Sequence, residues 1–458
     1  MTVICWFRRV LRLDDHPALV AAAKDGDVIP LVILDPAEAR DHPASAQRQA
    51  MSLPRLEASL HQRHSRLIVR RGDPAEVLEQ IARETGASAV HTTVGFPFAS
   101  DHGLQAAVER GGATLHLHEL ADLVPRASVL TKTGGVYKVF TPFWKAVRQT
   151  DIAPPLPTPT LSSPDSWPDS DGTDWPEARA AMDRGWDIVA DHIRPGEDEA
   201  MTRLDEFLEG TLPDYKEHRD HPWRPRATSN LSDALAVGEI SARRIWRHCQ
   251  PTFQDGQKGV DHFLSELCWR DFARELFHEA PDMASTPWRE EWTDFPWKRD
   301  NNDARDWRRG MTGVPMVDAG MRELYVTGQM HNRVRMITGS YLCKHLLTDW
   351  RVGLDWFAHC LIDWDAASNA MNWQWVAGCG PDASPFFRVF NPETQAEKFD
   401  EKSRYRDHWL KPDAEGAKEF AAATPKSWKI DLTHKPTPAI SLAEGRERAL
   451  DAYETVKS

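Results

Sequence analysis

The densest group of side chains that could do chemistry lies between residues 330 and 392. Helical spacing places four of them at i, i+3, i+4 and i+7 on one narrow polar face: Asn332, Arg335, Met336 and Gly339. Another face of the same helix has the spacing of a core: Val334, Ile337, Tyr341 and Leu342. Because glycine has no side chain, Gly339 lets a flat ligand approach the polar face closely.

Two aspartates follow this helix. Asp363 and Asp365 stand near apolar positions, and Asn369 comes four residues after Asp365. A buried carboxylate is costly unless a partner neutralises it, and Arg335 is the expected partner of one of them. The structural alternative is an ion pair that only caps a helix.

Trp373 and Trp375 are two residues apart, so on a helix they point in different directions. We expect one to face inward and the other to line a cavity. The alternative for each is core packing. The chain has 19 tryptophans in 458 residues, well above ordinary usage, which favours a functional role for the group.

The segment TSNLS at 228–232 precedes a helical run. Hydroxyl groups and free amide groups at a helix start form an anion site that suits a pyrophosphate. The alternative is an ordinary helix N-cap by Ser232.

A second helix, expected over 263–277, places Glu266, Trp269 and Arg270 on one face. These three side chains either bind a ligand or form only a structural ion pair and cation–π contact.

The first part of the chain alternates strands with helices. Apolar runs predict strands over 2–7, 28–34, 66–72, 88–94 and 113–119, and helices over 17–23 and 74–86. This alternation predicts an α/β domain with a doubly wound parallel sheet over 1–130. The first strand is not followed by G-x-G-x-x-G, so the sheet carries no mark of a dinucleotide site.

The remainder of the chain reads as helical. A linker is expected over 131–199, because 154–175 is rich in Pro, Ser and Asp. From about 200 helical periodicity dominates, which predicts a large all-α domain over 200–458. A last helix with alternating charges is expected within 435–458.

Composition excludes some classes of protein. The six cysteines are scattered without a C-x-x-C pair, which argues against a disulfide framework and against a zinc or iron–sulfur cluster, so no metal is expected. No apolar run approaches the ~20 residues of a membrane span and no signal-peptide pattern is present, so we expect a cytoplasmic protein. The net charge of −13 is unusual for a nucleic-acid binder, although a local basic patch remains compatible with it.

Four motifs in the central segment carry a family resemblance: M-H-N-R-V-R-M, D-W-D-A-A-S-N, N-W-Q-W-V-A-G-C-G and F-F-R-V-F-N-P. They resemble the helical FAD-binding domain of the photolyase/cryptochrome family, with the bacterial cyclobutane pyrimidine dimer photolyases as the nearest members. The resemblance extends through most of the chain. It implies an α/β antenna-type domain before the helical domain, FAD as cofactor and UV-damaged DNA as partner, bound by a monomer.

The resemblance also implies a set of flavin-binding residues. In it, Asn369 sits beside the flavin N5, Asp363 holds Arg335 against the ring, and Asp365 accepts from the ring or ribityl group. Asp233 replaces a common proline next to the expected phosphate loop. The full set is Tyr215, Thr228, Ser229, Asn230, Leu231, Ser232, Arg270, Arg335, Asp363, Asp365 and Asn369.

A second implied set binds the lesion. Glu266 contacts the damaged base, Trp269 and Trp375 form an aromatic wedge, and Arg333 and Arg388 grip flanking phosphates. With Asn332 and Met336 completing the pocket, the substrate set is Glu266, Trp269, Asn332, Arg333, Met336, Trp375 and Arg388. The implied catalytic residues are Glu266, Asn369 and three electron-conducting tryptophans, Trp297, Trp350 and Trp373.

The implied reaction is light-driven repair of cyclobutane pyrimidine dimers, in which excited reduced FAD passes one electron to a flipped-out dimer. Binding is expected to be salt-sensitive and largely indifferent to sequence. A cryptochrome-type blue-light receptor is the alternative, and a repair enzyme for (6–4) photoproducts is a third possibility, with His331 alone near its histidine pair.

A second, light-harvesting chromophore stays open, either methenyltetrahydrofolate or a deazaflavin. The start of the chain, from Trp6 to Leu19, resembles the family, but Val10 and His16 stand where Asp and Asn are usual. The segment 95–103 lacks the acidic and arginine residues common near antenna ligands.

Overall fold

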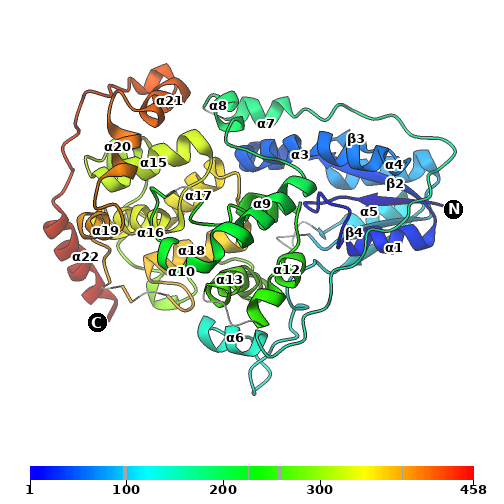
Figure 1. The fold of residues 1–458 in the computed structure, drawn as a ribbon, viewed down its shortest axis with the longest axis horizontal. Coiled ribbons are helices and arrows are strands. Elements are labelled where there is room, and N and C mark those ends of the chain that lie inside the picture. The colour runs from blue at the N-terminus through cyan, green and yellow to red at the C-terminus, as the bar shows by residue number, and fades with distance from the viewer. Residues whose placement is uncertain are drawn as a thin grey trace.

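The computed structural model describes residues 1–95, 101–182, 184–224, 226–254, 259–383, 385–386 and 388–457. Its first part is an α/β domain (Figure 1). In chain order its elements are β1 (Thr2–Trp6), α1 (Pro17–Asp25), β2 (Asp27–Leu34), α2 (Pro36–Asp41), α3 (Pro43–His61), β3 (Ile68–Arg71), α4 (Pro74–Thr85), β4 (Ala89–Thr93), α5 (Leu104–Arg110) and β5 (Thr114–His118).

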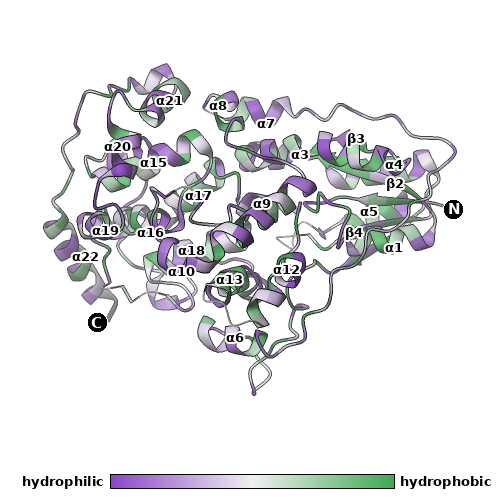
Figure 2. Cartoon of the chain, in the orientation of Figure 1, coloured by the Kyte–Doolittle hydropathy of each residue, from purple (hydrophilic) through white to green (hydrophobic). Residues whose placement is uncertain are grey.

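The strands form one parallel sheet, as the sequence predicted, and their order is β3-β2-β1-β4-β5. Ile4 in the central strand lies opposite Ile29 and Val90. Alternate strand residues pack on opposite faces, so α1 and α3 cover one side while α4 and α5 cover the other. Figure 2 shows strands that are largely green and helices with one green and one purple face.

Helix boundaries in this domain follow local chemistry. Asp73 accepts hydrogen bonds from the backbone N–H groups of Ala75 and Glu76, and Pro74 opens α4 with a preset φ. Gly86 ends it at φ 62°, in the left-handed region that a glycine tolerates without strain. The predicted helix over 74–86 is therefore confirmed.

The segment 151–175 crosses between the two domains without a helix or strand among its residues. It runs around the sheet before α7 (Figure 1). Backbone hydrogen bonds hold it against the α/β domain: Asp15 N–H to Leu156 O, Val28 N–H to Ser162 O and Asp171 N–H to Val69 O. These bonds order the segment against the α/β domain.

The rest of the chain is helical. Its helices are α6 (Phe140–Val147), α7 (Pro176–Ala181), α8 (Trp186–Ala190), α9 (Glu197–Gly210), α10 (Tyr215–His218), α11 (Ser232–Val237), α12 (Ala242–Gln254), α13 (Val260–Glu279), α14 (Asn302–Arg308), α15 (Pro315–Thr327), α16 (Asn332–Ser340), α17 (Trp350–Cys360), α18 (Ala366–Ala377), α19 (Pro392–Phe399), α20 (Arg404–Leu410), α21 (Glu415–Ala423) and α22 (Leu442–Lys457). A π-helical turn, Tyr341–His345, continues α16. Within the described residues, no helix has the length and apolar character needed to cross a membrane.

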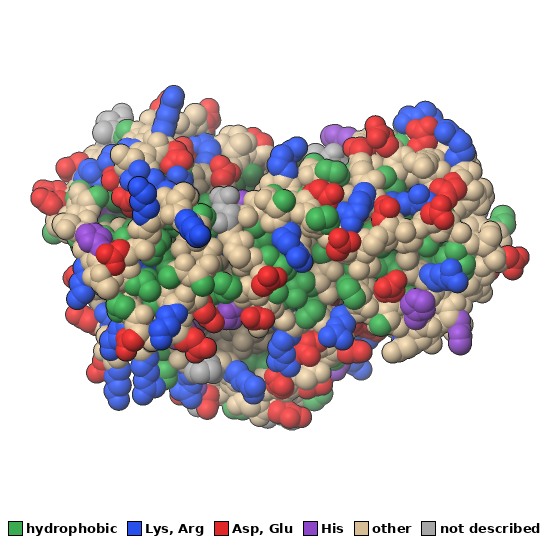
Figure 3. Space-filling model, turned by 90° about the horizontal axis from the view of Figure 1, so that it is seen from above, with side chains coloured by type: hydrophobic (Ala, Val, Ile, Leu, Met, Phe, Trp, Pro, Cys, Tyr) green, Lys and Arg blue, Asp and Glu red, His purple; other side chains and the backbone are tan. Residues whose placement is uncertain are grey.

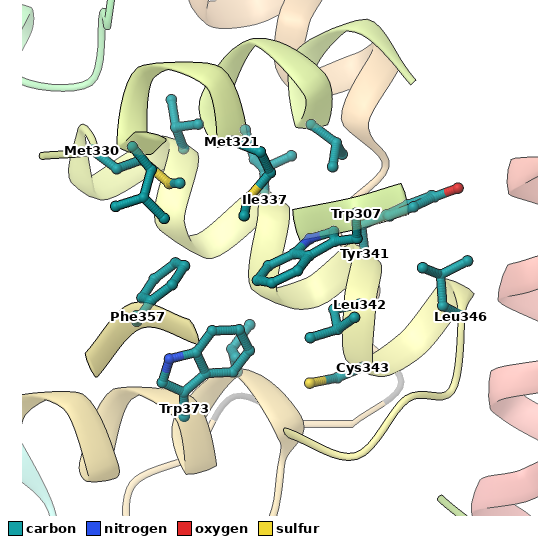
Figure 4. Close-up of a cluster of buried hydrophobic side chains, with 14 of the residues drawn as sticks. Trp307, Met321, Met330, Ile337, Tyr341, Leu342, Cys343, Leu346, Phe357 and Trp373 are labelled. Atoms are coloured by element: carbon teal, nitrogen blue, oxygen red, sulfur yellow. The ribbon is translucent and has the colours of Figure 1, made fainter. Parts of the chain in front are cut away.

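Two apolar clusters hold the helical part together. One joins α6, α9, α12 and α13 to the start of α18. The other joins α14, α15, α16 and α17 to the rest of α18. Figure 4 shows part of the second cluster, where Trp307, Ile337, Leu342, Phe357 and Trp373 point toward one another. These core contacts hold α16, α17 and α18 in place on one side, and their opposite faces are available to form a site.

Candidate functional site

A cavity of about 420 Å³ lies in the helical domain, a volume within the usual range for small-molecule sites. Its walls come from the loop before α11, the end of α15, α16, and the segment that joins α17 to α18. The predicted residues that line it are Thr228, Ser229, Asn230, Leu231, Ser232, Asn332, Arg335, Met336, Asp363, Asp365, Asn369, Trp373 and Trp375.

The polar face of α16 is confirmed as one wall. Asn332, Arg335, Met336 and Gly339 all line the cavity. The predicted apolar face is fully buried on the other side. The helix begins at Asn332 because His331 Nδ1 accepts the backbone N–H of Arg333 at 3.2 Å. Local helical spacing thus determined which residues face the site.

The expected partnership of Arg335 is also present. Arg335 Nη2 donates to Asp363 Oδ2 at 2.8 Å, and Arg335 Nε donates to the carbonyl of Met330 at 2.7 Å. The other carboxylate oxygen, Asp363 Oδ1, is buried and has no hydrogen-bond partner among the described residues. A buried acceptor of this kind favours a ligand that carries an N–H or O–H donor.

Asp365 lines the cavity and also has the structural role that was its alternative, an ion pair that caps a helix. Its Oδ1 caps α18 by accepting the backbone N–H of Ser368 at 2.9 Å, and its Oδ2 accepts from Arg274 Nη2 at 3.0 Å. Burial alone would raise the pKa of Asp365, but Arg274 and Arg270 lower it to about 2. The cavity wall therefore carries a fixed negative charge at this position.

Asn369 presents one end of its amide to the cavity. Its Nδ2 donates one of its two N–H groups to the carbonyl of Leu354 at 3.1 Å, and its side-chain oxygen can accept from a ligand. An oxygen at this place accepts a hydrogen bond and does not donate one.

The loop before α11 lines the cavity with three small polar side chains, Thr228, Ser229 and Ser232. Helix α11 starts at Ser232 with Leu231 at the cap position and no side-chain capping bond. The alternative of an ordinary N-cap by Ser232 is therefore not realised. Asn230 has φ 50°, and its Oδ1 accepts the Thr228 hydroxyl at 3.0 Å.

Both tryptophans of α18 reach the cavity, with Trp373 buried and Trp375 partly exposed. The expectation of one inward and one cavity-lining ring is confirmed in part, because Trp373 does both. Its indole lies against Gly353 of α17, where a Cβ would be 2.1 Å from Cη2. At Gly339 the nearest atom to an added Cβ is Val376 Cγ1, at 3.2 Å. Gly353 therefore allows Trp373 to pack closely on α17, and the close approach of a flat ligand to Gly339 stays a prediction.

The other two predicted electron carriers lie behind this wall. Trp350 is fully buried at the start of α17, one turn before Gly353, and Trp297 is partly buried. Lys298 N–H bonds to Leu347 O at 2.7 Å, and Asp349 N–H bonds to Lys298 O at 2.8 Å. These bonds bring the backbone next to Trp297 beside the backbone next to Trp350.

Eight predicted residues lie outside the described lining of the cavity: Glu266, Trp269, Arg270, Tyr215, Arg333, Arg388, Trp350 and Trp297. The three from α13 have separate partners. Glu266 pairs with Arg219 at 2.5 Å, Trp269 stacks on Phe140 with ring centroids 3.8 Å apart, and Arg270 donates to Asp122 at 2.8 Å. The three side chains share one side of α13, as predicted, and their joint role in binding a lesion or cofactor stays a prediction.

The remaining three also have local partners. Tyr215 is buried against Phe207 and Phe263, and burial raises its pKa far above the ordinary value. Arg333 pairs with Asp220 at 2.6 Å. Arg388 is exposed, and its carbonyl accepts from the buried Lys344 Nζ at 3.0 Å. Their contacts with a cofactor or substrate stay predictions.

Sequence reasoning missed some cavity residues. Glu323 of α15 lines the cavity, accepts from Tyr405 Oη at 2.5 Å, and has its pKa raised to about 7 by burial. Gln329, Trp364 and Asn372 also line it. Three charged residues interrupt the apolar run of α15, Asp318, Arg322 and Glu323, and no local signal distinguishes Glu323 from the other two. The described residues contain no group of three or more His, Cys, Asp or Glu side chains able to hold a metal ion.

Comparisons with known proteins identify relatives of the whole chain. Residues 3–160 match the family described as DNA photolyase, and residues 263–455 match the FAD binding domain of DNA photolyase. A deoxyribodipyrimidine photo-lyase of Agrobacterium fabrum is 39% identical, over 99% of this chain and 98% of the relative.

Solved structures agree with this relationship. The crystal structure of a bacterial class III photolyase from Agrobacterium tumefaciens has a TM-score of 0.88 and 38% identity, covering 100% of this chain and 98% of that one. A Synechocystis cryptochrome has a TM-score of 0.86 and 30% identity, covering 98% and 99%.

Proposed function

Because the chain belongs to the photolyase/cryptochrome family, with FAD as its cofactor, we propose that it repairs cyclobutane pyrimidine dimers in DNA in a light-driven reaction. The observation that carries the proposal is the α16–α18 wall, where the Arg335–Asp363 pair, the unpartnered Asp363 Oδ1 and Asn369 face one cavity. When bound and reduced, FAD supplies the photoexcited electron donor.

The residues of the wall fit a flavin. Asp363 Oδ1 would accept a ring N–H, and the Asn369 oxygen would accept from the protonated N5 of the reduced ring. Asp365 keeps its charge next to Arg274 and would accept from a ribityl hydroxyl. Thr228, Ser229 and Ser232 would donate to the phosphates, with Asn230 and Leu231 shaping the loop. Arg270 and Tyr215 would approach the phosphates from outside the wall.

The lesion would enter beside Trp375, Asn332 and Met336, which line the same cavity. Trp269 has one ring face on Phe140, so a flipped-out pyrimidine would stack on the other face. Glu266 would hydrogen-bond the pyrimidine and stabilise charge that develops on it. Arg333 and Arg388 would hold flanking phosphates, which makes binding nearly indifferent to sequence.

Electrons that reduce the flavin would come through Trp373, Trp350 and Trp297. Two features support this order. Trp373 lines the cavity and touches α17 one turn after Trp350, and the Lys298–Asp349 backbone bond joins the neighbours of Trp350 and Trp297. Trp297 is partly exposed, as an entry point at the surface requires.

A blue-light receptor is the alternative, because the Synechocystis cryptochrome shares the fold over 98% of this chain. Repair of (6–4) photoproducts is disfavoured, since His331 already caps α16 through Nδ1.

Three further predictions go with this proposal: a second chromophore, a monomeric state and a cytoplasmic location. Residues 96–100, part of the segment weighed for antenna ligands, lie outside the described residues.

The test is repair itself. Purified, photoreduced protein is mixed with an oligonucleotide that contains one thymine dimer and is exposed to blue light. We expect restored thymines in the light and none in the dark. A protein with reduced flavin that binds the oligonucleotide but restores no thymines would contradict the repair proposal and favour the receptor.

A further inference from the structure

Asp233, the residue that replaces a common proline, is buried between two arginines. Only 1% of its side chain is exposed. Its Oδ2 accepts from Arg48 Nε at 2.9 Å, and its Oδ1 accepts from Arg203 Nη1 at 2.9 Å. Burial alone would raise the pKa of Asp233, but Arg48 and Arg203 hold it below the ordinary value. The aspartate is therefore charged at neutral pH and fixed on both sides.

Arg203 connects this aspartate to the cavity loop. The same Nη1 atom donates to the carbonyl of Asn230 at 2.6 Å. Asn230 has the strained φ of 50°, and its side chain receives the hydroxyl of Thr228. Arg203 thus links the charged Asp233 directly to the backbone of the loop.

Arg48 extends the network into the other domain. It lies on α3 of the α/β domain and is completely buried. Its Nη2 donates to Glu239 Oε2 at 2.6 Å, and its Nη1 donates to Ser52 Oγ at 2.7 Å. All its nitrogens thus find acceptors, two of them carboxylates of the helical domain at the two ends of α11. A guanidinium with this planar, multidentate set of bonds fixes orientation as well as charge.

We propose that Arg48, Asp233 and Arg203 are positioning residues, through which the α/β domain holds the loop 228–232 in the shape that receives the FAD pyrophosphate. The inference rests on the proposed placement of the phosphates over that loop. It gives the α/β domain a role in cofactor affinity that does not depend on an antenna chromophore.

The experiment compares flavins with and without phosphates. Flavin-free Arg48→Met and Asp233→Asn proteins are titrated with FAD and with riboflavin, and binding is followed by flavin fluorescence. We expect FAD affinity to fall about tenfold or more, the effect of one charge-assisted hydrogen bond, while riboflavin affinity changes by less than about twofold. The nearly isosteric Asp233→Asn change keeps the test decisive if Arg48→Met folds poorly.

Arg243→Met is the matched control. Arg243 also makes an ion pair between the domains, with the buried Asp15 at 2.5 Å, and its side-chain hydrogen bonds among the described residues go to this aspartate and not to the loop. We expect a lower unfolding temperature with unchanged FAD affinity. Equal loss of FAD and riboflavin affinity in all three variants would show general destabilisation and would overturn the inference.

A double variant, Thr228→Ala with Ser232→Ala, tests the phosphate placement separately. If it leaves FAD affinity unchanged, the placement is wrong and the inference falls with it. If it weakens FAD selectively while Arg48→Met and Asp233→Asn do not, the placement stands and the positioning role is refuted.

Discussion

Asp363 has a buried oxygen without a hydrogen-bond partner among the described residues, so substitutions at this position of the cavity wall are expected to affect ligand binding strongly. Asp363→Asn keeps the shape but removes the charge that holds Arg335. We expect FAD affinity to fall by about ten- to a hundredfold, because the partly buried Arg335 loses its charged partner and is no longer held against the cavity. Fluorescence titration of flavin-free protein measures this. Asp355→Asn, at an exposed position of α17, serves as the control and is expected to change nothing.

Glu323 in the cavity wall makes the free energy of unfolding depend on pH. Burial raises its pKa from 4.5 to about 7, against the smaller opposing effect of the Tyr405 hydrogen bond. The folded protein therefore holds this proton when the unfolded chain has lost it, so the free energy of unfolding decreases as pH rises from about 4.5 to about 7. The decrease is at most about 3.5 kcal/mol, since one pKa unit corresponds to roughly 1.4 kcal/mol.

Urea unfolding of flavin-free protein at several pH values measures this decrease. Glu323→Gln is expected to flatten it over the same window. Glu217→Gln, on the exposed surface of α10, provides the comparison. If the Glu323→Gln variant and the parent protein show the same slope, Glu323 titrates normally and burial is not the controlling effect.

Single residues also show how far sequence reasoning reached. The face of α16 was predictable because helical spacing is local, and one helix decides which of its residues share a side. The partners of Glu266, Trp269 and Arg270 were not predictable. Their partners, Arg219, Phe140 and Asp122, come from distant parts of the chain.

Helix α3 is an element that sequence patterns alone did not predict. It spans Pro43–His61, contains Pro54, and buries polar residues such as Arg48 and Gln47, so it has no clear apolar period. The sheet strands, which are apolar along their length, and α4, which has Asp73 and Gly86 at its ends, were predicted from local signals. Tertiary ion pairs stabilise α3, and those are not visible in a sequence.

The contact between α17 and α18 depends on one glycine. In Gly353→Ala, the new Cβ would overlap the Trp373 ring, so we expect a loss of about 1–3 kcal/mol in the free energy of unfolding. Light-driven reduction of the flavin should also slow, because Trp373 must shift. Denaturant unfolding and flavin absorbance under illumination measure the two effects.

Gly339→Ala is the matched control for this contact. It gives the same helix-propensity gain of roughly 1 kcal/mol at another helix interior, but its Cβ meets its nearest atom, Val376 Cγ1, only at 3.2 Å. The neighbour then needs to move by only a few tenths of an ångström. If both changes destabilise the protein equally, overlap with the Trp373 ring is not the cause of the destabilisation by Gly353→Ala.

The molecule as a whole is acidic, with a net charge of −13, although DNA is its proposed substrate. On the face shown in Figure 3, acidic and basic side chains are interspersed. Several arginines that the family resemblance assigns to ligands are paired with carboxylates, including Arg333 with Asp220. We therefore expect DNA binding to use few phosphate contacts.

Salt dependence tests this at the scale of the whole molecule. Each phosphate contact on duplex DNA contributes about 0.9 to the slope of log affinity against log salt. Arg388 is exposed and its loop is anchored by Lys344, so Arg388→Gln is expected to reduce the slope by about one on any dimer-containing sequence. Arg40→Gln removes the same charge from the exposed α2, and should leave the slope unchanged. An equal reduction by both changes would mean that net charge governs binding, whereas no reduction by Arg388→Gln would remove this residue from the DNA-binding face.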